Sequence, residues 1–186
     1  MQEVSVVIPN FNGMAYLDGV LSSLERQTIR NFEVILVDNG STDGSCAFVS
    51  AEYPWVHMIQ LPENYGFSRA VNEGIRAARS PYVLLLNNDT EAEPDFLEEM
   101  VAALRRHKKA FSCQAKMIQL HDRDKMDDAG NYYCALGWAF ARGKGKDISH
   151  YDREQKIFST CAGAAIYRKK FIDRIGDFDE EHFAYL

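Results

Sequence analysis

Apolar residues over the first hundred positions follow two patterns that alternate along the chain. One pattern is a short continuous run of apolar residues. In the other, which lies between these runs, apolar residues recur at i, i+3, i+4 and i+7, and this spacing predicts amphipathic helices. One helix begins near Leu17 and ends at about Gln27, and another contains Leu97 and Leu104, with Pro94 expected in its first turn. The runs themselves, rich in β-branched residues and leucine, predict strands at residues 4–8, 32–37, 56–61 and 82–86.

This alternation, repeated four times, predicts an α/β fold with a mostly parallel central sheet and helices on both faces. It breaks down after about Phe111. We expect a weak strand at residues 114–120, a mobile loop at 142–146, and a last apolar strand at 157–167 that leads into a short helix ending at Gly176. Because no linker or internal repeat divides the chain, residues 1–186 are expected to form one domain.

Composition and charge narrow the class of protein. The chain is 46% hydrophobic and 26% charged, which is usual for a soluble globular domain. Its net charge of −6 disfavours a nucleic-acid partner bound through its phosphates. The sequence contains no apolar stretch of the roughly 20 residues that a transmembrane segment needs, and no signal peptide is recognisable, so we expect a cytoplasmic protein. The four cysteines lack CxxC spacing, which favours free thiols over a zinc site.

Polar clusters follow three of the predicted strands, at residues 9–13, 38–41 and 87–89. Ligands of parallel sheets bind beyond the carboxyl ends of the strands, so these clusters are expected to form one site. The glycine patterns GxGxxG, GxxxxGK[ST] and GxSxG are absent, which excludes the usual dinucleotide-binding, P-loop and serine-hydrolase sites.

Asp38 and Phe11 could together bind a pyrimidine base. A carboxylate at the end of a buried strand can accept a hydrogen bond from the imide N–H of uracil or thymine, and the Phe11 ring offers the base an apolar face. Alternatively, Asp38 only shapes an Asx-type turn before the next helix.

Asp89 and Arg69 are candidates for binding a diphosphate and its metal ion. Mg²⁺ or Mn²⁺ often takes only one or two carboxylates and completes its shell with phosphate and water, so Asp89 alone is chemically sufficient. Arg69 lies in the first turn of a predicted helix, where it could reach a diphosphate together with the helix N-terminus. The alternatives are a turn aspartate and an ordinary solvated arginine.

Five ordered motifs, spread over nearly the whole chain, closely resemble family 2 inverting glycosyltransferases, and within them the rhamnosyltransferase-like bacterial cell-surface enzymes. They read VSVVIPNFNG, FEVILVDNGSTDGS, NYGFSRAVNEGI, YVLLLNNDT and CAGAAIYRKKFIDRIGDFDEEHFAYL. The resemblance implies a GT-A fold whose residues 1–110 bind the nucleotide-sugar and whose residues 111–186 form a partial acceptor-side half.

The resemblance also implies the reaction and its ligands. A UDP- or dTDP-sugar would donate its sugar, with inversion and with Mn²⁺ or Mg²⁺ bound, to a hydroxyl of a saccharide or lipid-linked acceptor in bacterial cell-surface polysaccharide synthesis. Asp89 would bind the metal as the last residue of a DxD motif whose first position is Asn87 here, and residues 162–165 would floor the acceptor side. The residues expected to bind the nucleotide-sugar are Pro9, Phe11, Asn12, Asp38, Gly66, Arg69 and Asn88.

By this resemblance, the general base belongs to a Glu-Asp pair expected just beyond Leu186. No catalytic residue is therefore expected within the 186 residues, and the chain should bind donor better than it transfers sugar. Asp179 and Glu180 precede that pair, and the resemblance implies that they help to shape the acceptor side. The alternative, which we expect, is that they shape a turn and cap it locally.

Two other functions remain open from the sequence. One is a non-catalytic nucleotide-binding or assembly module, which would form a homodimer through apolar surface that a following segment would otherwise cover. The other is a sugar-1-phosphate nucleotidyltransferase, although residues 9–13 lack its glycine-rich phosphate loop. In the full-length protein we expect a location at the inner face of the membrane, held peripherally.

Overall fold

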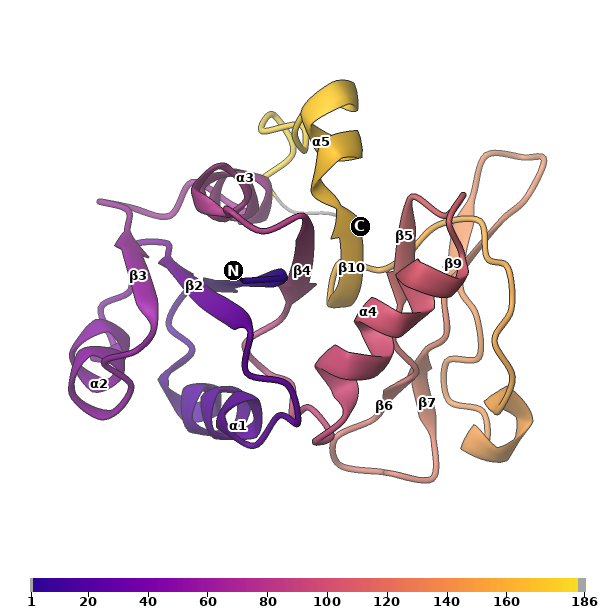
Figure 1. Ribbon diagram of the computed structural model, residues 1–186, viewed down its shortest axis with the longest axis horizontal. Coiled ribbons are helices and arrows are strands. Elements are labelled where there is room, and N and C mark those ends of the chain that lie inside the picture. The colour runs from indigo at the N-terminus through magenta and orange to yellow at the C-terminus, as the bar shows by residue number, and fades with distance from the viewer. Residues whose placement is uncertain (1, 184–186) are drawn as a thin grey trace.

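A computed structural model describes residues 2–183 and shows a six-stranded sheet in the order β3-β2-β1-β4-β10-β5 (Figure 1). The first four strands in this order are parallel, and β10 runs antiparallel to both of its neighbours. The mostly parallel sheet predicted from the sequence is therefore confirmed. The strands are β1 (Val4–Asn10), β2 (Phe32–Asp38), β3 (His57–Gln60), β4 (Tyr82–Leu86), β5 (Ser112–Gln114) and β10 (Ala164–Arg168).

Helices cover both faces of this sheet, as the alternation predicted (Figure 1). One face packs against α1, α2 and α4, and the other against α3 and α5. Along β1, Val6 contributes to the first core and Val7 to the second, and both are fully buried. Because both faces of β1 are buried, most of its residues are apolar and do not alternate with polar ones. The helices are α1 (Met14–Glu25), α2 (Ser45–Glu52), α3 (Phe67–Ala77), α4 (Phe96–Arg106) and α5 (Lys169–Ile175).

Three predicted boundaries were wrong. The last strand, β10, begins at Ala164 rather than near residue 157. The weak strand expected at residues 114–120 is divided between β5 and β6 (Met117–Ile118), which pairs with β7 (Met126–Asp128) in a separate two-stranded sheet. Pro94 precedes the N-cap residue Asp95 and so lies before the first turn of α4. The two strand corrections have one cause, because pairing with neighbouring strands, rather than local hydrophobicity, sets the limits of β5, β6 and β10.

The second part of the chain also contains a hairpin, formed by β8 (Asn131–Tyr133) and β9 (Ala139–Ala141). The mobile loop expected after it is a hydrogen-bonded turn, in which Lys146 N–H donates to the Gly143 carbonyl at 2.8 Å. Arg142 is buried there and donates to the Gln155 amide oxygen at 2.7 Å. A short 3-10 helix, η1 (Ile148–Tyr151), follows. Within residues 2–183, no helix is long and apolar enough to cross a membrane.

Candidate functional site

The carboxyl ends of β1, β2 and β4 are joined by the side chain of Asn10. Its amide nitrogen donates to Asp38 Oδ1 at 3.0 Å, and its amide oxygen accepts from Asn88 Nδ2 at 2.7 Å. Asn10 and Asp38 are also register partners at the ends of β1 and β2. The prediction that the three polar clusters share one edge of the sheet is thus confirmed. Asn10 itself was not among the expected site residues, although it is the amide residue at the end of a buried apolar strand.

Asp38 is only 2% exposed, and both of its carboxylate oxygens accept hydrogen bonds from the protein. Besides the bond from Asn10, Oδ2 accepts from the Ser41 N–H at 3.0 Å, which is the Asx-type turn considered from the sequence. Burial alone would raise the pKa of Asp38, but hydrogen bonds from Ser41 and Asn10 outweigh burial and hold the pKa below its usual range. A carboxylate offers about four lone-pair positions, and the Ser41 hydroxyl and the Cys46 thiol also form hydrogen bonds to Asp38, so a ligand N–H would have to share the carboxylate with these groups.

The loops that follow β1 and β2 are bound to each other. Asn12 N–H donates to Ser41 Oγ at 2.9 Å, and the Asn12 side-chain oxygen accepts from Thr42 N–H at 2.9 Å. Asn12 adopts a positive φ of 50°, which Asn tolerates better than most residues. The preceding side chain, Phe11, is 47% exposed, so its ring faces solvent beside the Asp38 turn.

Gly13 has no room for a side chain at this edge. A Cβ atom there would lie 2.0 Å from Asn88 Nδ2 and 2.4 Å from Asn10 Oδ1. Glycine is therefore required for the bridge between β1 and β4 to form, a role that the sequence alone did not identify.

Asp89 extends this edge with an exposed carboxylate. Its side chain makes no hydrogen bond or ion pair within the described part of the chain. Residues 2–183 also contain no group of three or more His, Cys, Asp or Glu side chains that could hold a metal. The Asp89 carboxylate therefore fits a divalent cation only if the phosphate oxygens of a ligand and water complete the metal's coordination shell, as in a magnesium or manganese diphosphate.

A second set of amides fixes the loop before α3. Asn39 is buried, and its side-chain nitrogen donates to Asn64 Oδ1 at 2.8 Å and to the Gly66 carbonyl at 3.0 Å. Asn64 Oδ1 also accepts from Gly66 N–H at 2.9 Å. Gly66 has a positive φ of 86°, which glycine adopts without strain. The loop before α3, which was expected to lie near the nucleotide-sugar, is therefore hydrogen-bonded to the residue that follows β2.

The chain itself covers the N-terminus of α3. Phe67 N–H donates to the Phe183 carbonyl at 2.8 Å, and a Cβ on Gly66 would lie 2.3 Å from that oxygen. Arg69 forms ion pairs with Glu180 at 2.8 Å and with Glu73 at 2.9 Å. A diphosphate at Arg69 would have to share the guanidinium with Glu180 or displace it.

Glu180 is the centre of a network that joins the C-terminal segment to α3. Its carboxylate accepts from Asn72 Nδ2 at 2.9 Å, from Arg69 at 2.8 Å and from Arg76 at 3.0 Å. The hydrogen bond from Asn72, followed by the one from Arg69, lowers the pKa of Glu180 to about 2. Glu180 lies in the expected turn, which His182 N–H closes on the Asp179 carbonyl. The local capping role expected for its side chain was wrong, because its partners lie on a helix more than a hundred residues away.

Asp179 does take the expected local role, since its side chain accepts from the Glu181 N–H at 3.0 Å. The expected position of the general base, beyond Leu186, lies outside the described residues.

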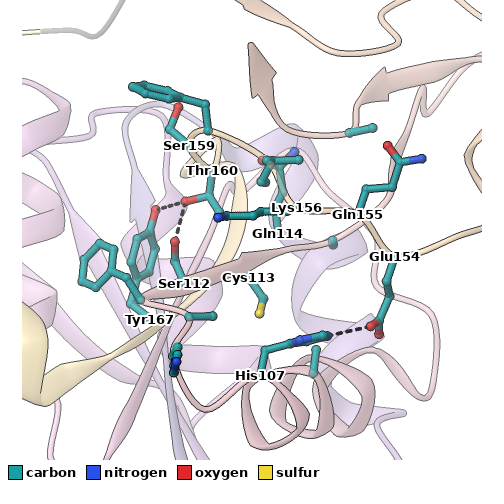
Figure 2. A pocket seen from close by; sticks show the side chains of 18 of the residues that line it. His107, Ser112, Cys113, Gln114, Glu154, Gln155, Lys156, Ser159, Thr160 and Tyr167 are labelled. Atoms are coloured by element: carbon teal, nitrogen blue, oxygen red, sulfur yellow. Dashed lines mark hydrogen bonds and ion pairs between the residues drawn. The ribbon is translucent and has the colours of Figure 1, made fainter. Parts of the chain in front are cut away.

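A separate groove of about 1470 Å³ runs along the β5 edge of the sheet (Figure 2). Hydroxyls line part of it, where Thr160 Oγ1 lies 3.3 Å from Ser112 Oγ and 3.0 Å from Tyr167 OH. At another part of the groove, His107 lies 2.9 Å from Glu154. None of the residues expected to bind the nucleotide-sugar or metal lines this groove. It is therefore a different feature from the strand-end site.

Comparison with known proteins adds to this geometry. The sequence profile described as Glycosyl transferase family 2 matches residues 5–176. TuaG of Bacillus subtilis (strain 168), a glycosyltransferase named for teichuronic acid biosynthesis, is 29% identical over 128 residues, which is 67% of this chain and 50% of TuaG.

Two solved structures share the fold. Residues 1–349 of TarS from S. aureus, in complex with UDP, superpose with a TM-score of 0.71 at 22% identity, covering 98% of this chain and 52% of that one. The mannosyltransferase PcManGT of Pyrobaculum calidifontis, in complex with GDP-Man and Mn²⁺, gives a TM-score of 0.67 at 18% identity, covering 96% and 48%. The chain spans about half the length of TuaG and of these two structures.

Proposed function

Since this chain belongs to glycosyl transferase family 2, we propose that it forms the nucleotide-sugar-binding part of a glycosyltransferase that acts in cell-surface polysaccharide synthesis. The observation that carries the proposal is the Asn10 bridge, which brings the Asp38 turn and the Asn88 turn to one edge of the sheet. Of the functions open from the sequence, family membership favours the transferase over the nucleotidyltransferase and the assembly module.

In this proposal the base of the nucleotide-sugar lies against the exposed Phe11 ring, and its imide N–H donates to the Asp38 carboxylate in place of one of the protein's own donors. Pro9, Asn12 and Asn88 complete the nucleoside side of the site. The diphosphate then extends toward Asp89. A divalent cation bound there would neutralise the negative charge that builds up on the leaving nucleotide diphosphate. That TarS was solved with UDP and PcManGT with Mn²⁺ supports this class of ligand.

We still predict that Gly66 and Arg69 contact the nucleotide-sugar, but the ion pair of Arg69 with Glu180 restricts how Arg69 could do so. Because Glu180 already holds Arg69 at 2.8 Å, this arginine would contact a diphosphate only together with that carboxylate or after losing it.

For the chemical step, we propose in-line attack by an acceptor hydroxyl, with inversion at the anomeric carbon. A carboxylate of the pair expected beyond Leu186 would take the hydroxyl proton. A chain of these 186 residues should then transfer little or no sugar, since loss of a general base typically costs about 10²–10⁴-fold in rate. Extension by the native residues that follow should restore transfer. Robust transfer that is lost on Asp179→Asn or Glu180→Gln would show that the base has been misplaced.

The test of donor binding is calorimetry with UDP, dTDP and GDP, with and without Mn²⁺. We expect a preference for the pyrimidine nucleotides, reduced in Asp38→Ala by about 1–3 kcal/mol because the imide N–H loses its acceptor. Equal binding of UDP and GDP by the unaltered chain would contradict the assignment of Asp38.

The metal assignment has its own variants. Mn²⁺ should strengthen diphosphate binding, and Asp89→Ala should abolish that enhancement while Asn87→Asp increases it by adding a second carboxylate. Asp124→Ala, which removes an exposed carboxylate elsewhere, is the control and should change nothing. The assignment fails if the Mn²⁺ dependence of Asp89→Ala equals that of the unaltered chain.

The acceptor class and a peripheral location at the inner face of the membrane remain predictions that go with this function. The homodimer remains a prediction that goes with the assembly module.

A further inference from the structure

The hairpin of β8 and β9 exposes large apolar side chains that no described residue covers. Leu136 is 83% exposed and Trp138 is 72% exposed, the two highest values among large hydrophobic residues in the described range 2–183. Tyr133 and Phe158, beside them, are 53% and 68% exposed. We refer to these four side chains as the aromatic face. Solvent-exposed apolar groups gathered in this way usually mark an interaction surface.

The backbone holds this hairpin in one shape. Three register pairs join β8 to β9, and at the tip Cys134 N–H donates to the Trp138 carbonyl at 2.9 Å. Gly137 closes the turn with a φ of 90°, a conformation that glycine adopts readily. Next to the turn, where Tyr133 pairs with Ala139, the Tyr133 ring stacks on Phe158 with centroids 4.9 Å apart. The tip therefore presents Leu136 and Trp138 to solvent as part of a hydrogen-bonded turn.

Positive charge is concentrated in the part of the sequence that contains the hairpin. Residues 105–160 hold 12 lysines and arginines against 7 aspartates and glutamates, a net charge of +5, whereas the whole chain carries −6. Lys108, Lys109, Arg153 and Lys156 are exposed, and their side chains make no hydrogen bond or ion pair within the described part of the chain.

These four cations line the same groove as Phe158, and Lys156 is labelled among the lining side chains in Figure 2. Because Tyr133 stacks on Phe158, the aromatic face adjoins the groove that the four cations line. The two features therefore form one surface, with apolar tips that project and cations at their side.

We propose that this surface binds an anionic lipid membrane, with Leu136 and Trp138 entering the interface and Lys108, Lys109 and Lys156 contacting the headgroups. Tryptophan and tyrosine favour the headgroup level of a bilayer, and clustered lysines are attracted to anionic lipids. A saccharide would stack on flat rings, but Leu136, the most exposed of these residues, has no such face. The inference deepens the predicted peripheral membrane location and does not depend on sugar transfer or nucleotide binding.

The two tryptophans of the chain, Trp55 and Trp138, allow each side of the molecule to be observed separately. Trp55→Phe leaves Trp138 as the reporter without altering the hairpin, and Trp138→Phe leaves Trp55, which is 41% exposed. With vesicles of equimolar phosphatidylglycerol and phosphatidylcholine, emission from Trp138 should shift to shorter wavelength, whereas emission from Trp55 should not change.

Cosedimentation with the same vesicles measures the affinity. Replacing both Leu136 and Trp138 by serine should lower the partition coefficient about tenfold or more. Lys108→Gln with Lys109→Gln should lower it about fivefold for each lysine removed. Arg26→Gln with Arg79→Gln makes the same charge change at other exposed positions and should have little effect.

The proposal is overturned if Trp138 emission does not shift with these vesicles, or if it shifts equally with vesicles of phosphatidylcholine alone. It is likewise overturned if a soluble acidic polysaccharide produces the same shift, or if light scattering shows a dimer that Trp138→Ser dissociates, because the surface would then serve a saccharide or a second copy. UDP binding measured on the same samples tests the nucleotide-sugar site independently, so failure of the membrane proposal can be distinguished from failure of the proposed function.

Discussion

Replacing Asn10 by alanine should destabilise the fold and weaken nucleotide binding together. Asn10 is 2% exposed, and its side chain makes hydrogen bonds to Asp38 at 3.0 Å, to Ser41 at 3.3 Å and from Asn88 at 2.7 Å. Each such bond contributes about 1 kcal/mol net, and a buried charged oxygen left without its donor costs more. We therefore expect the free energy of unfolding to fall by about 2–4 kcal/mol.

The same change should loosen the Asp38 carboxylate and so reduce UDP affinity by roughly tenfold, the equivalent of about 1.4 kcal/mol. Urea denaturation followed by circular dichroism measures the first effect, and calorimetry the second. Asn31→Ala is the matched control, because that exposed amide makes only a surface bond to Glu3.

The pH dependence of this variant gives an independent check. The folded pKa of Asp38 lies below the ordinary value of 3.8, so the stabilisation of its carboxylate is present above that pH and is lost as the pH falls through the folded value. The difference in stability between the unaltered chain and Asn10→Ala should therefore shrink in strong acid. A cost below about 0.5 kcal/mol, the size expected for a surface substitution, with unchanged UDP affinity, would refute the role of Asn10 as the bridge.

Two further predictions concern the C-terminal segment. Glu180→Gln should release this segment from α3, which faster amide hydrogen exchange at residues 177–183 would show, while Glu181→Gln should not. Folding lowers the pKa of Glu180 from 4.5 to about 2, so the stabilisation by its carboxylate is present above pH 4.5 and is lost as the pH falls toward 2. Gly66→Ala should cost more stability than Gly44→Ala in thermal unfolding. Both glycines have a positive φ, but only a side chain at residue 66 would clash with the Phe183 backbone. We expect this clash to lower the free energy of unfolding by about 1–3 kcal/mol more than the change at residue 44 does. Equal exchange in the two glutamine variants, or equal melting of the two alanine variants, would contradict the docking of this segment.

The sequence by itself determined the α/β class, the four parallel strands and the edge at which the polar clusters meet. A strand that is buried on both faces is apolar over most of its length, as β1 is at residues 6–8 and β2 at residues 34–37, and the polar residues at each strand end are held there by the chain. Such features depend on neighbours in sequence, and therefore they can be read from local patterns.

Only the tertiary structure decided which side chains complete the site. The Asn10 bridge depends on the lateral order of β2, β1 and β4, and Glu180 reaches Arg69 across 111 residues of chain. The start of β10 at Ala164 depends on its antiparallel pairing between β4 and β5. These contacts join elements that are distant in the sequence, and local periodicity carries no record of which distant partner an element will meet when the core packs.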